Sequence, residues 1–240
     1  MVYNKTKVEK MLDHNEIYSS KADKYEQLIS KEDYQNNIKR TIMDICSIKG
    51  CDLIDIGAGT GRLSCLFGPI SKSIIAFDQS QAMLDVALDK FQKLGINNWK
   101  AQVADHRSLP IEDGSVDVIM AGWTICYLCS TKITNWRDNF HSILQEMKRV
   151  VRKNGILIIL ETLGTGNEEP LYFEHLIGYF ELLKGHGFSH KTIRTDYHFD
   201  SIEEGEDLIK FFFGDELASK FIRTGSKILP ECTGIWWLRV

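Results

Sequence analysis

Residues 53–64 read LIDIGAGTGRLS, an apolar run that ends in an acid and is followed by glycines at positions 57, 59 and 61. The run predicts a buried strand that breaks into a tight loop and then a helix. Glycine lets the backbone of such a loop approach a ligand where a side chain would collide. The stretch is therefore typical of a cofactor cradle, although a plain strand, turn and helix without a ligand is the alternative, because a glycine-rich loop alone is a weak signal.

The spacing of the glycines separates this loop from that of the dinucleotide-binding dehydrogenases. Those proteins carry Gly-x-Gly-x-x-Gly, which here would need glycine at position 62. That position holds Arg62, so the third glycine comes one residue early, and Asp55 lies two residues before the first. A nicotinamide oxidoreductase is therefore the least favoured of the enzyme classes.

A second strand supports the ligand hypothesis. Residues 73–78 read SIIAFD and end in Asp78, twenty-one residues after Gly57. An acid at this strand end can accept two charge-assisted hydrogen bonds from a ribose diol. Ser80 is a suitable N-cap for the helix that follows, where apolar residues recur at helical spacing from Met83 to Leu88.

The glycine loop, Asp55 and Asp78 together resemble the nucleotide-binding signature of the class I S-adenosylmethionine-dependent methyltransferases, in particular the small-molecule, UbiE-like members (methyltransferase types 11 and 25). The resemblance implies an α/β, three-layer, Rossmann-like fold with a seven-stranded, mostly parallel sheet whose last strand is antiparallel. It also implies S-adenosyl-L-methionine as cofactor. It covers the whole chain, but its specific residues lie between Asp55 and Trp123.

The resemblance assigns roles to two further strand ends. Residues 103–106 close a short strand, and Asp105 is nominated to accept the adenine amino group, with Ala104 and His106 beside it. The alternative for His106 is a solvated loop histidine.

Residues 115–122 form the fourth expected strand, and the resemblance places the methyl-bearing sulfonium near residues 121–127. Trp123 and Tyr127 can offer an aromatic face to a cationic sulfur. The alternative is that both are ordinary aromatic residues of the core.

A set of candidate site residues follows from these assignments. At the cofactor we expect Tyr25, Asp55, Gly57, Ala58, Gly59, Gly61, Asp78, Gln79, Met83, Ala104, Asp105, His106, Gly122, Trp123 and Tyr127. Methyl transfer is an in-line displacement at an activated carbon, so positioning and desolvation can suffice and no metal is required. A general base is needed only if the acceptor must lose a proton. The weak candidates are Glu161, His106 and Tyr127, followed by His141 and His175, and none is assigned.

The rest of the core repeats the alternation of strand and helix. A helix is expected over residues 140–151, with Gly155 as its C-terminal stop, and ILIIL at residues 156–160 reads as a buried strand. Near-continuous apolar strands separated by helices indicate a parallel sheet covered on both faces. Ligands bind at the carboxyl ends of such strands, where Gly57, Asp78, Asp105, Trp123 and Glu161 fall.

The carboxyl-terminal part is expected to return to the sheet. Residues 191–199 and 235–240 read as strands, and the resemblance makes them its hairpin-like edge. Between them, Ser201-Ile202-Glu203-Glu204 has the spacing of a capping box, and a second helix is expected over about 215–223.

Two segments flank the nucleotide core. Residues 8–46 look helical, and the resemblance makes Tyr25 a lid over the cofactor; a surface helix packed on the sheet is the alternative. Residues 170–184 form an aromatic helix expected to cap the acceptor pocket, against a plain packing helix. The single domain, 1–240, thus divides into a helical lid (1–46), a cofactor-binding core (47–162), a substrate-capping insertion (163–188) and carboxyl-terminal strands and helices (189–240).

Composition narrows the function classes. The 240 residues carry a formal net charge of −4 with dispersed basic residues, which argues against a DNA footprint. No segment reads as a signal peptide or membrane span, so a cytoplasmic monomer or homodimer acting on a small molecule is expected. An RNA or protein methyltransferase and a non-catalytic S-adenosylmethionine-binding or interaction module are the alternatives. The six cysteines read as reduced thiols, and the lone Cys126-x-x-Cys129 lacks the second pair of a zinc site.

Overall fold

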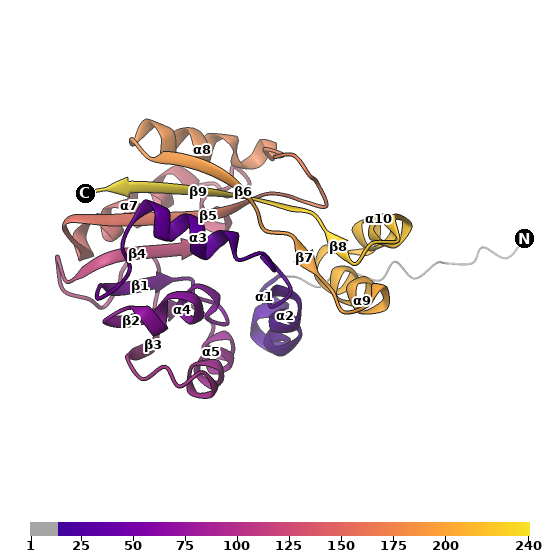
Figure 1. Ribbon diagram of the computed structural model, residues 1–240. Coiled ribbons are helices and arrows are strands. Elements are labelled where there is room, and N and C mark those ends of the chain that lie inside the picture. Colours follow the sequence, from indigo (N-terminus) through magenta and orange to yellow (C-terminus); the bar gives the residue numbers. More distant parts are fainter. Residues whose placement is uncertain (1–13) are drawn as a thin grey trace, which may run out of the picture.

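A seven-stranded sheet forms the centre of the protein (Figure 1). The structure is a computed structural model that describes residues 14–240, with side chains from residue 16 on; residues 8–13 of the expected helical segment lie outside this range. The sheet strands are β1 Asp52–Ile56, β2 Ser73–Asp78, β3 Trp99–Val103, β4 Val116–Gly122, β5 Val151–Thr165, β6 Ser189–Arg194 and β9 Glu231–Arg239. Their order is β3-β2-β1-β4-β5-β9-β6, and β9 alone runs antiparallel to its neighbours. The predicted fold is confirmed.

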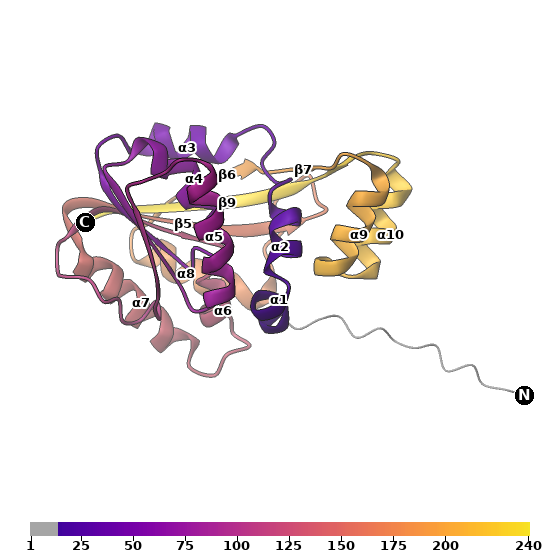
Figure 2. The ribbon, with the colours of Figure 1, turned by 90° about the horizontal axis from the view of Figure 1, so that it is seen from below.

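Helices cover both faces of this sheet (Figure 2). One face carries α3 Asn37–Ile45, α4 Arg62–Phe67 with the short 3-10 turn η1 Gly68–Ile70, and α5 Gln81–Lys93; the other carries α6 Cys126–Cys129, α7 Trp136–Val150 and α8 Glu174–Gly185. Side chains alternate along each strand, so Leu53 joins the α3–α4 core while Ile54 and Ile56 join the α7–α8 core. Burial on both faces explains why these strands read as continuous apolar runs.

A further group of helices lies beyond the end of the sheet. It consists of α1 His14–Ser20, α2 Ala22–Ile29, α9 Ile202–Phe213 and α10 Asp215–Thr224, with the two-stranded ribbon of β7 Tyr197–His198 and β8 Ile228–Leu229 (Figures 1 and 2). Leu28 of α2 packs in the same cluster as Leu208 and Phe221. The predicted cap is present, because the Glu204 amide donates to Ser201 Oγ at 3.1 Å. Among the described residues, no helix has both the length and the apolar character needed to cross a bilayer.

The predicted stop of α7 at Gly155 is wrong. The helix ends at Val150, Val151 is already extended, and Asn154 turns the chain with a φ of 68°. Gly155 lies within β5, where a Cβ atom would sit 2.7 Å from the Asp117 carbonyl oxygen. Glycine is therefore required there by the close approach of β4, and not by a helix terminus.

The helix expected over residues 170–184 is present as α8, but it packs on the sheet, which agrees with the alternative of a packing helix. The helix begins at Glu174, and α8 is the crossover that joins β5 to the parallel strand β6. Tyr179 is fully buried, and Phe180 and Leu183 pack with it in the core shared with α7. The aromatic pattern indicated a buried face without indicating which surface covers it. The insertion that reaches the end of the sheet is residues 195–230, between β6 and β9.

Candidate cofactor and acceptor site

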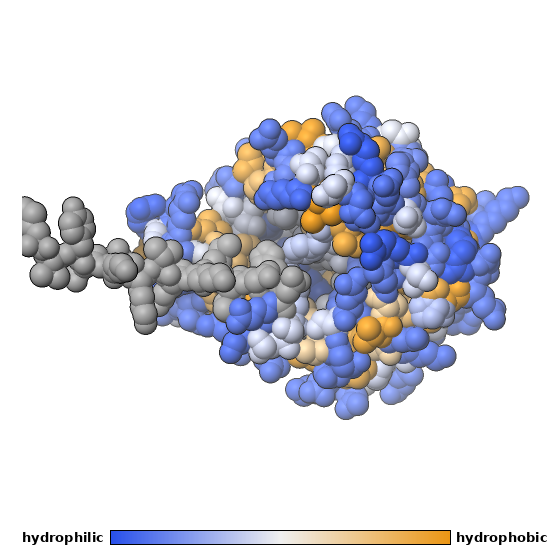
Figure 3. Space-filling model, turned by 180° about the vertical axis from the view of Figure 1, so that it is seen from behind, coloured by the Kyte–Doolittle hydropathy of each residue, from blue (hydrophilic) through white to orange (hydrophobic). Residues whose placement is uncertain are grey.

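A cavity of about 840 Å³ lies where the carboxyl ends of the strands meet the end helices. This volume is in the usual range of small-molecule sites. The surface seen from behind is mostly hydrophilic, with apolar side chains in small groups (Figure 3). Among the residues expected at the cofactor, those that line the cavity are Tyr25, Gly57, Ala58, Gly59, Asp78, Gln79, Met83, His106, Gly122, Trp123 and Tyr127.

Asp78 holds the glycine loop in place. Its Oδ2 accepts from the Gly59 amide and its Oδ1 from the Ser80 amide, both at 2.8 Å. Each carboxylate oxygen can accept a second hydrogen bond, so Asp78 keeps acceptor capacity toward the cavity. The loop also lies against Thr124: a Cβ atom on Gly57, whose φ is 64°, would sit 2.1 Å from Thr124 Oγ1. Glycine is thus required at position 57 by both conformation and space.

Asp55 and Gly61 do not line the cavity. Asp55 is buried and accepts from both the amide and the hydroxyl of Ser64, at 3.0 and 2.7 Å, so it caps the first turn of α4. Burial raises the pKa of Asp55 to about 7. A Cβ atom on Gly61 would sit 2.9 Å from the Phe91 ring, so this glycine lets α4 and α5 pack closely. Both residues shape the loop from behind.

Ala104 and Asp105 also stay outside the cavity lining. Arg107 donates to Asp105 through Nε at 2.8 Å and Nη2 at 2.7 Å, and this pairing lowers the pKa of Asp105 to about 2. The neighbouring His106 does line the cavity, with Nε2 2.8 Å from Thr124 Oγ1. Burial lowers the pKa of His106, which favours a neutral ring at pH 7.

Trp123 has a strained backbone at the end of β4. Its φ is 52°, which is uncommon for a bulky residue, and strain of this kind is concentrated at functional sites. The Arg62 guanidinium lies 4.3 Å from the centroid of a Trp123 ring. The aromatic face expected to meet the sulfonium therefore already contacts a cation.

Tyrosines from the amino-terminal helices close the cavity from outside. Tyr18 OH lies 2.8 Å from Tyr127 OH, and the Tyr18 carbonyl accepts from Ser80 Oγ at 2.8 Å. Tyr25 packs edge-on against Tyr18 and lies 5.4 Å from the Phe212 ring of α9. Tyr25 thus lies at the expected lid position, where α1, α2 and α9 contact one another.

Three charged residues at the cavity were not predicted: Glu32, Arg62 and Glu231. Glu32 Oε2 and Arg62 Nη1 form an ion pair at 2.6 Å. Glu231 is 2 % exposed and accepts from Thr162 Oγ1 at 2.5 Å. Burial, with the nearby Glu32 charge, raises the pKa of Glu231 to about 8. The sequence held a signal for Glu231. The last strand was expected to be antiparallel, which places its first residue at the edge of the sheet where ligands bind. That strand was expected to start at Ile235, but it starts at Glu231.

The remaining base candidates lie away from the cavity lining. Glu161 is fully buried, and its Oε1 accepts from the Cys126 amide at 3.0 Å and from Tyr179 OH at 3.1 Å. Burial raises the pKa of Glu161 to about 7. His141 and His175 belong to α7 and α8 on the covered face of the sheet. Of the expected candidates, only His106 and Tyr127 reach the cavity.

The Cys126-x-x-Cys129 pair forms α6, and its thiols are free. Burial raises the pKa of both thiols, so they stay protonated at neutral pH. Thiolate is the form that binds metal or attacks a disulfide, and these residues do not fit either role. Within residues 14–240, the described side chains contain no group of three His, Cys, Asp or Glu residues placed to hold a metal ion.

A pH dependence of stability follows from Glu161. Its pKa is higher in the folded protein than in the unfolded chain, so the folded state binds more protons between about pH 5 and about pH 7. The free energy of unfolding should therefore fall as pH rises through this window. In Glu161→Gln, which keeps an oxygen acceptor for Cys126 and Tyr179, urea denaturation at about pH 5 and about pH 7.5 should show a smaller fall. The exposed Glu168→Gln is the control, and an unchanged slope in Glu161→Gln would contradict this account.

Comparison with known proteins adds sequence evidence to this geometry. Residues 54–159 match the family model described as a methyltransferase domain. A demethylmenaquinone methyltransferase of Staphylococcus aureus is 30% identical over 148 residues, which are 60% of this chain and 56% of that protein. The chain thus spans about half the length of the curated relatives it matches.

Solved structures show the same fold at lower sequence identity. A SAM-dependent methyltransferase from Aquifex aeolicus is 17% identical with a TM-score of 0.58, covering 92% of this chain and 98% of that one. The phosphoethanolamine N-methyltransferase 2 of Haemonchus contortus, in complex with S-adenosyl-L-methionine, is 16% identical with a TM-score of 0.61, covering 94% and 59%.

Proposed function

We propose that the chain is a class I S-adenosylmethionine-dependent methyltransferase that transfers a methyl group from S-adenosyl-L-methionine to a small-molecule acceptor. The domain match over residues 54–159, the 30% identical relative and the shared fold support this proposal. The observation that carries this proposal is the cavity formed by the glycine loop, the braced Asp78 and the end helices. Fold alone does not decide function, and the chemistry of this site is what supports methyl transfer.

The residues of the cavity fit the cofactor by their chemistry. Asp78 offers carboxylate lone pairs to a ribose diol, and Gly57 and Gly59 let the backbone approach the ligand. S-adenosyl-L-methionine supplies a methyl group on a positively charged sulfur. The chain's own contribution is to align an acceptor with that methyl group and to keep water out, and α1, α2 and α9 cover the cavity for this purpose.

The acceptor is not identified by the matched relative. That protein acts, by its name, on demethylmenaquinone, and the match covers 56% of its length. The family model matches residues 54–159, which include neither Glu32 nor Glu231. A small molecule is favoured over RNA because tyrosines close the cavity and, of the described residues that line it, Arg62 alone is a lysine or arginine and is already paired with Glu32.

Calorimetric titration tests the proposal. S-adenosylmethionine and S-adenosylhomocysteine should bind and NAD should not. Formation of S-adenosylhomocysteine in the presence of acceptors, followed by mass spectrometry, separates an enzyme from a non-catalytic binding module. Failure of both adenosyl compounds to bind would overturn the proposal.

The ring contacts of Tyr25 with α1 and α9 give a separate prediction. Tyr25→Ala removes the ring contacts with Tyr18 and Phe212, so α1 and α2 should close less well over a bound ligand. We expect affinity for S-adenosylhomocysteine to fall by about tenfold, or about 1.4 kcal/mol. Tyr34→Ala, at an exposed tyrosine outside the cavity, is the matched control. Equal affinities in the two variants would mean that Tyr25 is only part of the scaffold.

A further inference from the structure

Four buried polar atoms at the cavity lack a hydrogen-bond partner. Among the described residues, the cavity-lining members of this group are Glu32 Oε1, Thr60 Oγ1, Arg62 Nη2 and Glu231 Oε2. A buried polar atom without a partner costs about 1–3 kcal/mol, and a charged group costs more. Such atoms are rarely left unpaired, and their gathering at one cavity indicates a ligand that pairs with them.

The strand order places Glu231 far from the adenosyl end. Asp78 ends β2, and crossing β1, β4 and β5 leads to β9, which begins at Glu231. Four strand spacings of about 4.8 Å separate the two positions by about 19 Å. Since the glycine loop and Asp78 lie on the β1–β2 side, the end of the cavity near Glu231 is where an acceptor would lie.

The acceptor end has more acid than base. Arg62 pairs with Glu32, while no ion pair of the described residues includes Glu231. Aromatic side chains complete the lining there: Trp123, Tyr197, Phe212 and Phe213. Arg62 is near enough to lower the pKa of Glu231, but it is held by Glu32. A carboxylate that forms no ion pair, surrounded by aromatic rings, is complementary to an ammonium group, because both attract positive charge.

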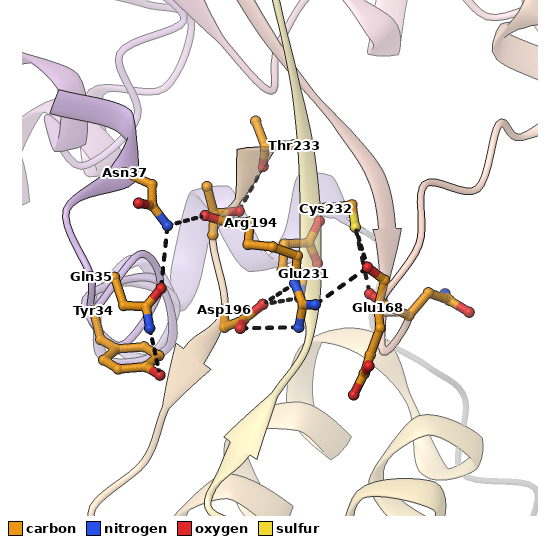
Figure 4. A network of polar contacts seen from close by, with 11 residues as sticks. Tyr34, Gln35, Asn37, Glu168, Arg194, Asp196, Glu231, Cys232 and Thr233 are labelled. Carbon is orange, nitrogen blue, oxygen red and sulfur yellow. Dashed lines mark hydrogen bonds and ion pairs between the residues drawn. The ribbon is translucent and has the colours of Figure 1, made fainter. Parts of the chain in front are cut away.

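The first residue of β9 is rigidly positioned. Figure 4 shows that the Glu231 backbone belongs to a polar network: its amide donates to Asp196 Oδ1 at 2.9 Å, and Arg194 Nε donates to the same oxygen at 2.8 Å. Asn37 Nδ2 donates to the Arg194 carbonyl at 2.8 Å, which ties the start of α3 to this point. The network fixes the backbone from which the Glu231 side chain reaches the cavity.

We propose that the acceptor is an amine, that its ammonium nitrogen binds Glu231 Oε2, and that Glu231 takes the proton that the nitrogen must lose. This inference rests on the proposed methyl transfer and names the substrate class of the same site. Arg62 is held by Glu32 through Nη1, so its Nη2 can donate a hydrogen bond to an oxygen or nitrogen atom of the amine substrate.

The step balances in atoms and charge. The ammonium nitrogen gives a proton to the Glu231 carboxylate and keeps the electron pair. That pair forms the bond from nitrogen to the methyl carbon, while the carbon–sulfur pair stays on sulfur. The products are a methylated ammonium ion, neutral thioether S-adenosylhomocysteine and a protonated Glu231, which returns its proton to water. Burial holds the pKa of Glu231 at about 8 in the free protein, and the charge of a bound ammonium lowers it, so the carboxyl group is ionised next to the amine and takes the proton.

The test offers the protein two pools of candidate acceptors with methyl-labelled S-adenosylmethionine. One pool holds small primary and secondary amines, such as phenethylamine and tryptamine, and the other holds the corresponding alcohols, phenols and carboxylates. We expect label in the amine pool. Label in the second pool alone, or in neither pool although S-adenosylhomocysteine binds, overturns the amine assignment. Absence of adenosyl binding instead overturns the proposed function, so the two failures are distinguishable.

Variants at position 231 test the role of the carboxylate. With the amine that is methylated, Glu231→Gln should lower kcat by at least about 100-fold while S-adenosylhomocysteine affinity stays within about twofold, and Glu231→Asp should recover part of kcat. Glu26→Gln is the control, because Glu26 also has an unpartnered carboxylate oxygen but does not line the cavity. A Glu231→Gln enzyme that folds, binds S-adenosylhomocysteine and turns over at the wild-type rate would overturn the role.

Discussion

Gly57→Ala is expected to abolish cofactor binding. The added Cβ would lie 2.1 Å from Thr124 Oγ1 and 2.5 Å from Thr124 Cβ, so the loop or the end of β4 must move. The left-handed backbone, with a φ of 64°, costs a further ~1–2 kcal/mol for any residue with a Cβ. We expect affinity for S-adenosylhomocysteine to fall by at least about 100-fold, measured by calorimetry, while circular dichroism still shows a folded protein.

A matched control and a second-site variant separate the two causes. Gly50 also has a positive φ, 78°, but an added Cβ would meet nothing within 4 Å, so Gly50→Ala should lose some stability and keep its affinity. In Gly57→Ala, the added change Thr124→Gly removes the overlapping atoms, whereas Thr124→Ala leaves the Cβ contact. If neither Thr124→Gly nor Thr124→Ala restores affinity to Gly57→Ala, the collision with Thr124 is not the cause.

Asp78→Ala should have the second-largest effect on affinity for the cofactor. The carboxylate braces the loop through the Gly59 amide and starts α5 through the Ser80 amide, and it is the expected ribose acceptor. Hydrogen bonds to a charged group contribute about 1.5–3 kcal/mol, so affinity for S-adenosylhomocysteine should fall by roughly 10- to 150-fold. Thermal unfolding is measured in parallel, because the two backbone contacts also support the fold.

Two comparisons make the Asp78 result specific. Asp85→Ala removes an exposed acid from the same helix, α5, and should leave affinity unchanged. Asp78→Asn keeps an oxygen acceptor for one amide and should retain more stability than Asp78→Ala but still lose affinity. If Asp78→Ala binds S-adenosylhomocysteine within a factor of two of wild type, Asp78 serves the loop and not the ligand.

Local sequence patterns carried most of the fold. Buried strands such as β2 and β4 have continuous apolar runs, and the glycine spacing after β1 set the loop apart from that of dehydrogenases. Caps could be predicted too: Ser80 accepts from the Met83 amide and Ser201 from the Glu204 amide. These features depend on residues within a few positions of one another, so the sequence is sufficient to find them.

Prediction was weaker wherever a residue's role depends on which way its side chain turns. Asp55 lies at the expected strand end, yet it faces the first turn of α4, because the unpaired Ser64 amide there needs an acceptor. The aromatic helix α8 has a buried face as expected, but that face packs against the sheet and does not face the cavity. A hydrophobic pattern states that a face is buried without stating against what.

What the sequence determined by itself is therefore the order of strands and helices, the glycine loop and the acid at its side. Only the tertiary structure shows which residues form the proposed acceptor end of the cavity. Glu32, Arg62 and Glu231 meet there, from the segment after α2, the start of α4 and the start of β9. These residues are far apart in the chain and share no local pattern. They come together because β9 runs antiparallel, which brings its first residue to the edge where the parallel strands end.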